Sequence, residues 1–148
     1  MAPIDSEPLQ PPTSSGSRLK VDTTMSVKYS IDQSRRLIVS VGEGIVGFGD
    51  IQDHQNRLLA DPDFDPAFDQ LIDASRVTSL VLTTDEVKTI ASRRVFSPGS
   101  LRAFVAVRPY IFGLGRMMEV YHEDIGQVHI FDSMDEALSW LGRSLPVG

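Results

Sequence analysis

The strongest constraint on the fold is the order in which two apolar periodicities follow each other from Val27 onward. Stretches in which every second residue is apolar alternate with longer stretches in which apolar residues recur at helical spacing. The first two alternating stretches, 27–31 and 37–41, are separated by the turn residues 32–34. This pair predicts an antiparallel hairpin at the start of the domain.

The remaining patterns predict helices and strands in turn. The expected helices run from 48 to 60, from 84 to before Pro98, from 111 to 125, and from after Ser133 to 141. Strands are expected at 68–74, 101–107 and 128–131, and 77–82 fits either a short strand or a packed loop. Because helices can cross over between parallel strands, we predict an α/β fold with four helices on a mostly parallel sheet of about five strands, with the hairpin as its antiparallel edge.

Composition limits the classes of protein. The first 26 residues are rich in proline and serine, which predicts a disordered tail at 1–26 followed by a single domain at 27–145. No apolar run is long enough to cross a membrane, and the tail lacks the apolar core of a signal peptide, so we expect a cytoplasmic protein. A net charge of −6 argues against nucleic-acid binding, and the lack of cysteine excludes disulfides, cysteine zinc sites and thiol nucleophiles.

Several segments together resemble the SpoIIAA-like family of small bacterial proteins. They are the hairpin, LLADPDFDPAFDQLIDAS at 58–75, FVAVRPYIFGLGRMMEVY at 104–121, and the closing VHIFDSMDEALSWLG. The family is related in fold to STAS domains, which antagonise anti-sigma factors, and to SEC14-type lipid-binding domains. The resemblance implies that fold over about 27–142 and is silent on activity.

The resemblance also implies a candidate phospho-acceptor. In STAS antagonists a Ser or Thr at the start of the second helix is phosphorylated, and Thr83 and Thr84 occupy the matching place here. A helix N-terminus favours a phosphate, but this chain lacks the family's Ser-Gly step and places Asp85 and Glu86 nearby. The other interpretation is that Thr83 caps the helix in a Thr-x-x-Glu capping box, as Ser133 does at the last helix.

A literal G-x-G-x-x-G motif spans 42–47 between a strand and a helix. In dinucleotide-binding folds such glycines admit a pyrophosphate to the helix N-terminus. Glu43 and Asp50 bring negative charge to this position, which argues against a phosphate ligand. A tight strand-to-helix turn that uses glycine backbone angles explains the motif more simply.

No motif indicates a metal site or a catalytic centre. Asp61, Asp63 and Asp65 alternate as in a calcium loop, but Pro66 stands where that loop needs glycine, so we interpret them as a solvated acidic loop. The histidines have no ligand spacing and are interpreted as surface or packing residues; they are His54, His122 and His129. There is no G-x-S-x-G elbow, and we predict neither a cofactor nor an enzyme activity.

Charge is distributed unevenly along the chain. Residues 50–73 carry seven acids and one arginine, whereas 88–116 carry basic residues and no acid. One hypothesis is a basic patch that accepts an anion or an acidic partner, and its candidate residues are Arg93, Arg94, Arg102, Arg108 and Arg116. The alternative is that these arginines pair with the acidic stretch, inside the fold or across a dimer.

The long third helix is unusually apolar. Phe112, Met117, Met118 and Tyr121 wrap more than one face, and methionine adapts well to ligands and partners. They predict either an apolar groove for a ligand or part of the core, and the same helix is a candidate homodimer seam.

Two functions are therefore compatible with the sequence. The first is a noncatalytic regulatory or protein-interaction module of the STAS type with an unidentified protein partner. The alternative is a small-molecule or lipid carrier, for which a dry cavity of several hundred cubic ångströms, on the order of other ligand sites, would be support and a fully packed core would be counter-evidence.

Overall fold

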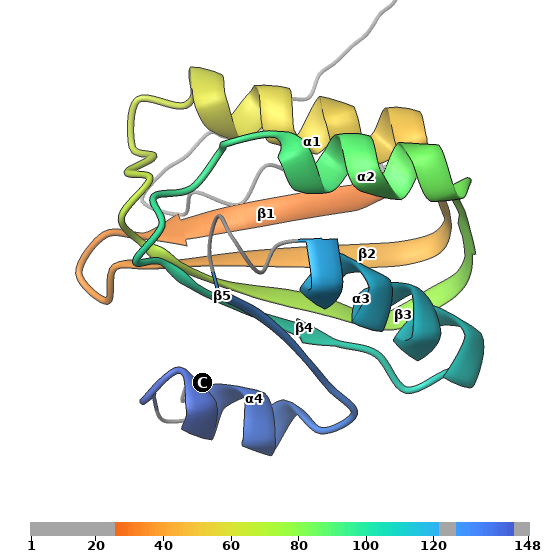
Figure 1. Ribbon diagram of the computed structural model, residues 1–148. Helices are drawn as coiled ribbons and strands as arrows, with labels where there is room; N and C mark the ends of the chain where they lie inside the picture. Colours follow the sequence, from red (N-terminus) through yellow and green to blue (C-terminus); the bar gives the residue numbers. More distant parts are fainter. Residues whose placement is uncertain (1–25, 122–126, 144–148) are drawn as a thin grey trace, which may run out of the picture.

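The computed structural model describes residues 26–121 and 127–143, which form one five-stranded sheet with four helices. The strands lie in chain order across the sheet (Figure 1). They are β1 (Val27–Asp32), β2 (Leu37–Gly47), β3 (Asp69–Val81), β4 (Leu101–Val105) and β5 (Gln127–Phe131). β1 pairs with β2 in antiparallel fashion, and every later pair is parallel. The predicted fold class and element order are confirmed.

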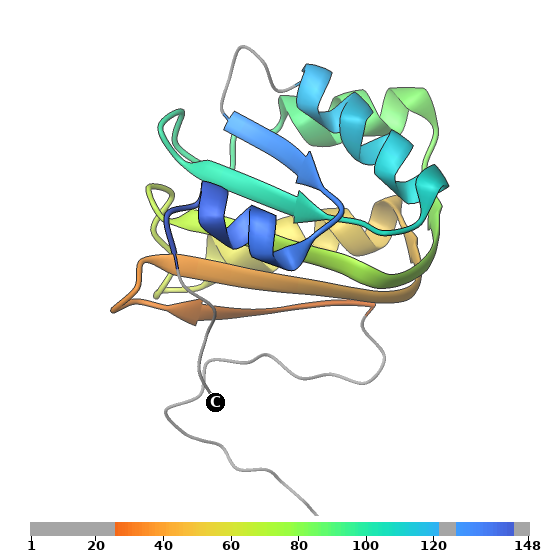
Figure 2. The ribbon, with the colours of Figure 1, turned by 90° about the horizontal axis from the view of Figure 1, so that it is seen from below.

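Helices cover both faces of the sheet. They are α1 (Phe48–Ala60), α2 (Thr84–Ser92), α3 (Pro109–Tyr121) and α4 (Met134–Trp140). The first three lie on one face, which we call the three-helix face, and α4 lies alone on the other (Figures 1 and 2). No helix within 26–121 and 127–143 is long and apolar enough to cross a membrane.

Alternation along each strand divides the core between these two faces. Leu37, Leu71 and Ala103 pack with α4, whereas Phe104 and Ile130 pack with α3. Because helices cover β4 on both sides, its residues from Arg102 onward are all buried. A strand of this kind has no solvent-facing side, so a charged residue within it faces the interior.

Two strands are longer than predicted. The ambiguous segment 77–82 belongs mostly to β3, which runs without a break from Asp69 to Val81. β2 continues through the glycine motif at 42–47, where Gly44 pairs with Val77 and Gly47 pairs with Val81. The motif is thus neither a phosphate-binding loop nor a tight turn. Gly44 has a φ of +69° beside a register shift in this pairing, a backbone angle that favours glycine, and a Cβ at Gly42 would lie 2.9 Å from a Val77 methyl carbon.

The helix boundaries follow their local signals. α1 has the predicted bounds, and the Asp50 carboxylate accepts a hydrogen bond from the Gly47 amide at 2.8 Å. α2 ends at Ser92, earlier than predicted, although Val95 beyond it is still buried. α3 starts two residues before the predicted position, at Pro109, and the predicted residues 122–125 lie outside the described ranges.

Candidate ligand-binding cavity

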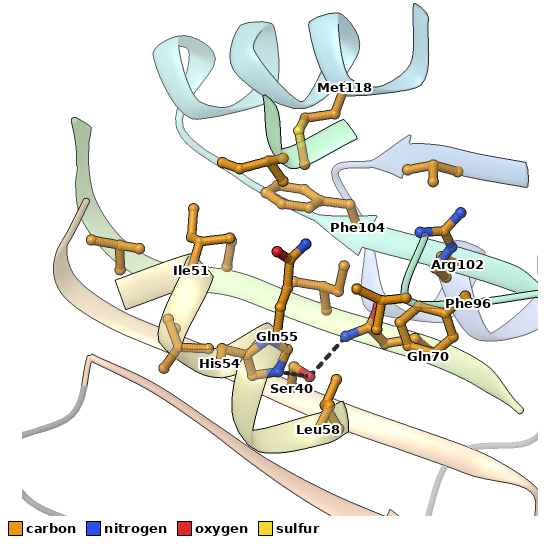
Figure 3. Close-up of a pocket in the computed structure, with 18 of the residues that line it drawn as sticks. Ser40, Ile51, His54, Gln55, Leu58, Gln70, Phe96, Arg102, Phe104 and Met118 are labelled. Atoms are coloured by element: carbon orange, nitrogen blue, oxygen red, sulfur yellow. Dashed lines mark hydrogen bonds between the residues drawn. The ribbon is translucent and has the colours of Figure 1, made fainter. Parts of the chain in front are cut away.

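A cavity of about 120 Å³ lies between the sheet and the three helices α1, α2 and α3. All five strands contribute to its floor, and side chains from the helices lie above it (Figure 3). We call it the three-helix cavity. Its walls are mostly apolar, and the main apolar contributors are Ile51, Ile72, Val77, Phe104, Met118 and Val128.

One row of polar residues crosses the cavity floor. Gln70 of β3 and Arg102 of β4 are direct neighbours in the strand register, and Ser40 lies on the adjoining strand β2. The Gln70 Nε2 atom donates a hydrogen bond to Ser40 Oγ at 2.9 Å. The polar row therefore holds a fixed arrangement, although three strands contribute to it.

His54 of α1 completes this arrangement from above. Its Nε2 atom lies 2.8 Å from Ser40 Oγ (Figure 3), and its ring meets the Tyr29 ring edge-on at a centroid distance of 5.7 Å. Burial, helped by the nearby Arg57 cation, lowers the pKa of His54 to about 4, while Asp53 opposes the shift. His54 is therefore neutral near pH 7 and contributes a hydrogen-bonding group without a charge.

Arg102 is the charged member of the row. The residue is only 8% exposed, and its guanidinium carbon lies 5.1 Å from the centroid of the Phe96 ring. Burial lowers the pKa of Arg102 to about 10, so the side chain remains protonated at neutral pH. Among the described residues no carboxylate forms an ion pair with it, and its buried Nε atom has no hydrogen-bond partner.

The structure separates the four residues of the predicted apolar groove. Met118 lines the three-helix cavity, whereas Phe112 and Met117 pack against the hydrophobic core. Tyr121 lies below the Lys88 ammonium group, whose nitrogen is 5.7 Å from the ring centroid. The ligand space is thus under α3 rather than in a groove beside it, and only Met118 of the four lines it.

The structure also disperses the predicted arginine patch. Arg93 and Arg94 precede the amino end of β4, and Arg108 follows its carboxyl end. Arg102 is buried between these two ends, and Arg116 is on α3. Because the strand separates these side chains, they do not form the single patch that their sequence spacing suggested.

Three of these arginines instead have local contacts. Arg93 donates to the side chains of Gln55 and Asn56 on α1, and Arg108 donates to the Val77 carbonyl at 2.8 Å. Arg116 pairs with Glu119 of its own helix at 3.7 Å. None of these contacts joins an arginine to an acid of 50–73 within the chain, and pairing across a dimer stays a prediction.

The candidate phospho-acceptors lie at the start of α2, and both are exposed. Thr83 is the N-cap: its Oγ1 accepts a hydrogen bond from the Glu86 amide at 3.1 Å. The Glu86 side chain in turn accepts from the Thr83 amide at 2.9 Å, which completes the predicted capping box. Ser133 similarly accepts from the Glu136 amide at 3.3 Å.

The remaining candidate side chains lie apart. Within 26–121 and 127–143, no three or more histidine or acidic side chains gather in a way that could hold a metal ion. His129 is on the α4 side, next to the Trp140 ring and 3.4 Å from Glu119. His122 lies outside the described residues.

Sequence reasoning missed the polar row of the cavity. Ser40 and Gln70 were not singled out, His54 was interpreted as a surface or packing residue, and Arg102 was assigned to a surface patch. The available signal was one polar residue within each of three strands. That signal is ambiguous, because alternation alone does not tell whether the polar side of a strand faces solvent or is covered by a helix.

These features define the chain as a small α/β domain with a partly open cavity on one face of a five-stranded sheet. The fold is similar to the crystal structure of an uncharacterized protein of the DUF3478 family from Shewanella loihica PV-4, which has a SpoIIAA-like fold. The TM-score is 0.52 at 16% sequence identity, over 82% of this chain and 98% of that one. The predicted resemblance is thereby confirmed at the level of the fold. No protein-family model matches the sequence, and no curated protein does.

Proposed function

We propose that this protein is a noncatalytic small-molecule binding protein whose ligand occupies the three-helix cavity. The observation that carries the proposal is a space of about 120 Å³ with apolar walls and one fixed polar row. A mostly apolar cavity with a few well-placed polar groups is typical of ligand sites. The apolar walls would bind the body of a ligand, and the polar row would orient it.

The size of the cavity restricts the ligand. An apolar cavity of about 150 Å³ engineered into another protein holds a benzene molecule, and drug-sized ligands need about 300 Å³ or more. At about 120 Å³ the space accommodates a body the size of one aromatic ring or a short branched chain. The carrier hypothesis is therefore narrowed to small molecules, because a long-chain lipid would need several times this volume.

Binding of benzyl alcohol tests the proposal. We expect saturable changes in the backbone NMR signals of residues around the cavity when this probe is added to the full chain. Ala74 lines the cavity, so Ala74→Leu should fill the space and abolish these changes. Ala60→Leu adds the same atoms at the exposed end of α1 and should leave binding unchanged. Absence of saturable changes in the wild type, or equal binding by Ala74→Leu, would contradict the proposal.

The noncatalytic part of the proposal concerns the Ser40–His54 pair. A serine nucleophile needs a histidine base that is itself oriented, usually by a carboxylate, and a hydroxyl that faces the substrate. Ser40 is 1% exposed and also accepts a hydrogen bond from Gln70, and no carboxylate of the described residues bonds to His54. These contacts support a structural and orienting role for the pair.

A second candidate function, a protein-interaction module, is favoured by an apolar surface at the carboxyl ends of the strands. Its side chains are half to two-thirds exposed and belong to Ile45, Val81, Val107 and Tyr110. Val81 pairs with Gly47 across the β2–β3 ladder, and the Tyr110 hydroxyl donates to the Leu80 carbonyl at 3.2 Å. Exposed apolar side chains that gather at one end of a sheet are typical of contact surfaces.

In its simplest form this surface would join two copies of the chain. We would compare the molar mass of the wild type and of Val81→Lys by size-exclusion chromatography with light scattering. A dimer that becomes a monomer in the variant would support the surface as an interface. A wild type that is monomeric at high concentration would contradict self-association through it.

A further inference from the structure

Among the described residues, Arg102 is a cation in the cavity wall without a counter-charge. The residue is more than nine-tenths buried, and within the described ranges its guanidinium has neither an ion pair nor a hydrogen bond. Buried charges in proteins are normally paired, because an isolated ion loses its hydration without compensation. Within the described residues this arginine therefore lacks a counter-charge, and a bound anion would supply one.

The guanidinium also lies next to an aromatic ring. Its carbon is over the Phe96 ring, and Phe96 in turn makes an edge-on contact with Phe64 at a centroid distance of 5.4 Å. A planar guanidinium presents parallel N–H groups that match the two oxygens of a carboxylate. Because burial and the Phe96 ring already restrict the movement of this side chain, less entropy would be lost when an anion binds.

The charge of the cavity limits the charge of the anion. Arg102 is the one lysine or arginine among the described residues that line the space, and His54 is neutral near pH 7. A monocarboxylate would neutralise this single positive charge. A phosphate monoester carries nearly two negative charges, and the second would be buried without a partner.

From these observations we infer that the cavity binds a small monocarboxylate, with its carboxylate on Arg102 and its apolar body against Ile72, Phe104 and Met118. This inference rests on the proposed function and adds the chemical class of the ligand. Figure 3 shows Arg102 beside Phe96 at one side of the space, with Phe104 and Met118 above it.

Calorimetric titration with benzoate and with benzyl alcohol tests the inference. The two probes have bodies of the same size, and only benzoate is charged at pH 7. We expect benzoate to bind the wild type at least about tenfold more tightly than benzyl alcohol, as is typical of hydrogen bonds to charged groups. In Arg102→Met, the affinity for benzoate should fall by at least about tenfold, whereas the affinity for benzyl alcohol should change by less than about threefold. Arg102→Lys keeps the charge but not the planar group, so its affinity for benzoate should lie between those of the wild type and Arg102→Met.

The outcomes separate this inference from the proposed function. If benzyl alcohol binds but benzoate does not, or if benzoate binds Arg102→Met as well as the wild type, the carboxylate inference is overturned and the cavity is still a ligand site. If neither probe binds the wild type, the proposed function is overturned, and the carboxylate inference is overturned with it.

A measurement on the wild type alone guards against a variant that does not fold. The Nε–Hε NMR signal of Arg102 should move when benzoate is added and should stay in place with benzyl alcohol. A signal that responds to neither probe, or equally to both, would also overturn the inference.

Discussion

The Arg102 guanidinium rests on the Phe96 ring, with 5.1 Å between the guanidinium carbon and the ring centroid, and no carboxylate of the described residues pairs with it. A cation–π contact of this kind returns about 2 kcal/mol or more when desolvated, which is less than the usual cost of burying a cation. The ligand-free fold is therefore strained electrostatically at this one position.

Arg102→Met should stabilise the ligand-free protein. Burial lowers the pKa of Arg102 to about 10, and a shift of this size corresponds to about 3 kcal/mol at about 1.4 kcal/mol per pKa unit. Methionine has a similar length and needs no counter-charge, so we expect the free energy of unfolding in urea to rise by about 1–3 kcal/mol. The exposed Arg94→Met should change it by less than about 0.5 kcal/mol. A marked loss of stability in Arg102→Met alone would show that the cation is already compensated.

Stability should fall on acidification because of His54. Its folded pKa is about 4 and its unfolded pKa is 6.5, so between these values the unfolded chain binds a proton that the folded chain does not. The contribution of neutral His54 to the free energy of unfolding is thus fully present above pH 6.5 and decreases as the pH falls toward 4. Between about pH 7.5 and about pH 5, the wild type should lose about 2 kcal/mol more than His54→Gln in urea unfolding. Equal losses in both proteins would mean that His54 titrates normally.

Two glycines of α3 should respond in opposite ways to alanine. A Cβ at Gly115 would overlap Ile130 Cδ1 and lie 3.1 Å from Ile130 Cγ1, whereas a Cβ at Gly113 would meet nothing within 4 Å. We expect Gly113→Ala to raise the free energy of unfolding by about 0.5–1 kcal/mol through helix propensity. Gly115→Ala should lower it by about 1–3 kcal/mol through overpacking.

Ile130→Val removes the overlapping Cδ1 atom and provides the control for this pair. It should recover part of the stability lost in Gly115→Ala, measured as a coupling energy in a double-mutant cycle. If the effects of Gly115→Ala and Ile130→Val on the free energy of unfolding are additive, the expected overlap between these two residues does not occur.

The α2 cap bears on both stability and modification. Thr83→Ala should cost about 1 kcal/mol because the Glu86 amide loses its acceptor, and Thr84→Ala, one residue inside the helix, should cost less. We also expect no phosphate on either residue after incubation with host lysate and ATP, because the acidic first turn of α2 would repel it. A mass increase that is lost in Thr83→Ala or Thr84→Ala would support the STAS-type switch instead.

Ser40 should be unreactive toward a fluorophosphonate probe. Its hydroxyl is buried and shared between His54 and Gln70, so it is not free to attack an electrophile. Labelling followed by intact-mass measurement should detect no adduct. An adduct that is absent in Ser40→Ala would overturn the noncatalytic assignment.

The elements with strong local signals were predictable. The apolar periodicity and Pro62 defined α1 to the residue, and the capping box at Thr83 located the start of α2. The single strand β3 was not predictable in this way, because Asp73, Ser75 and Arg76 interrupt its alternation. Pairing with the equally long β2 keeps this segment extended, and that is a tertiary effect.

The candidate site depends even more on tertiary structure. Ser40, Gln70 and Arg102 each lie about thirty residues or more from the next, on three different strands. Strand register places Gln70 beside Arg102, and a hydrogen bond joins Gln70 to Ser40. Alternation of Arg102 with Leu101 and Ala103 is equally typical of a strand with one face in water. Only the packing of helices on both faces distinguishes the two cases.

This double covering also has an evolutionary consequence. Gln70 and Leu71, like Arg102 and Ala103, are neighbours in the chain, yet one of each pair lines the cavity and the other packs with α4. Mutations that change the charge of the cavity or the shape of its walls need no compensating change among the residues that pack with α4. A descendant of this chain could therefore acquire a different ligand while half of its core retains the ancestral packing.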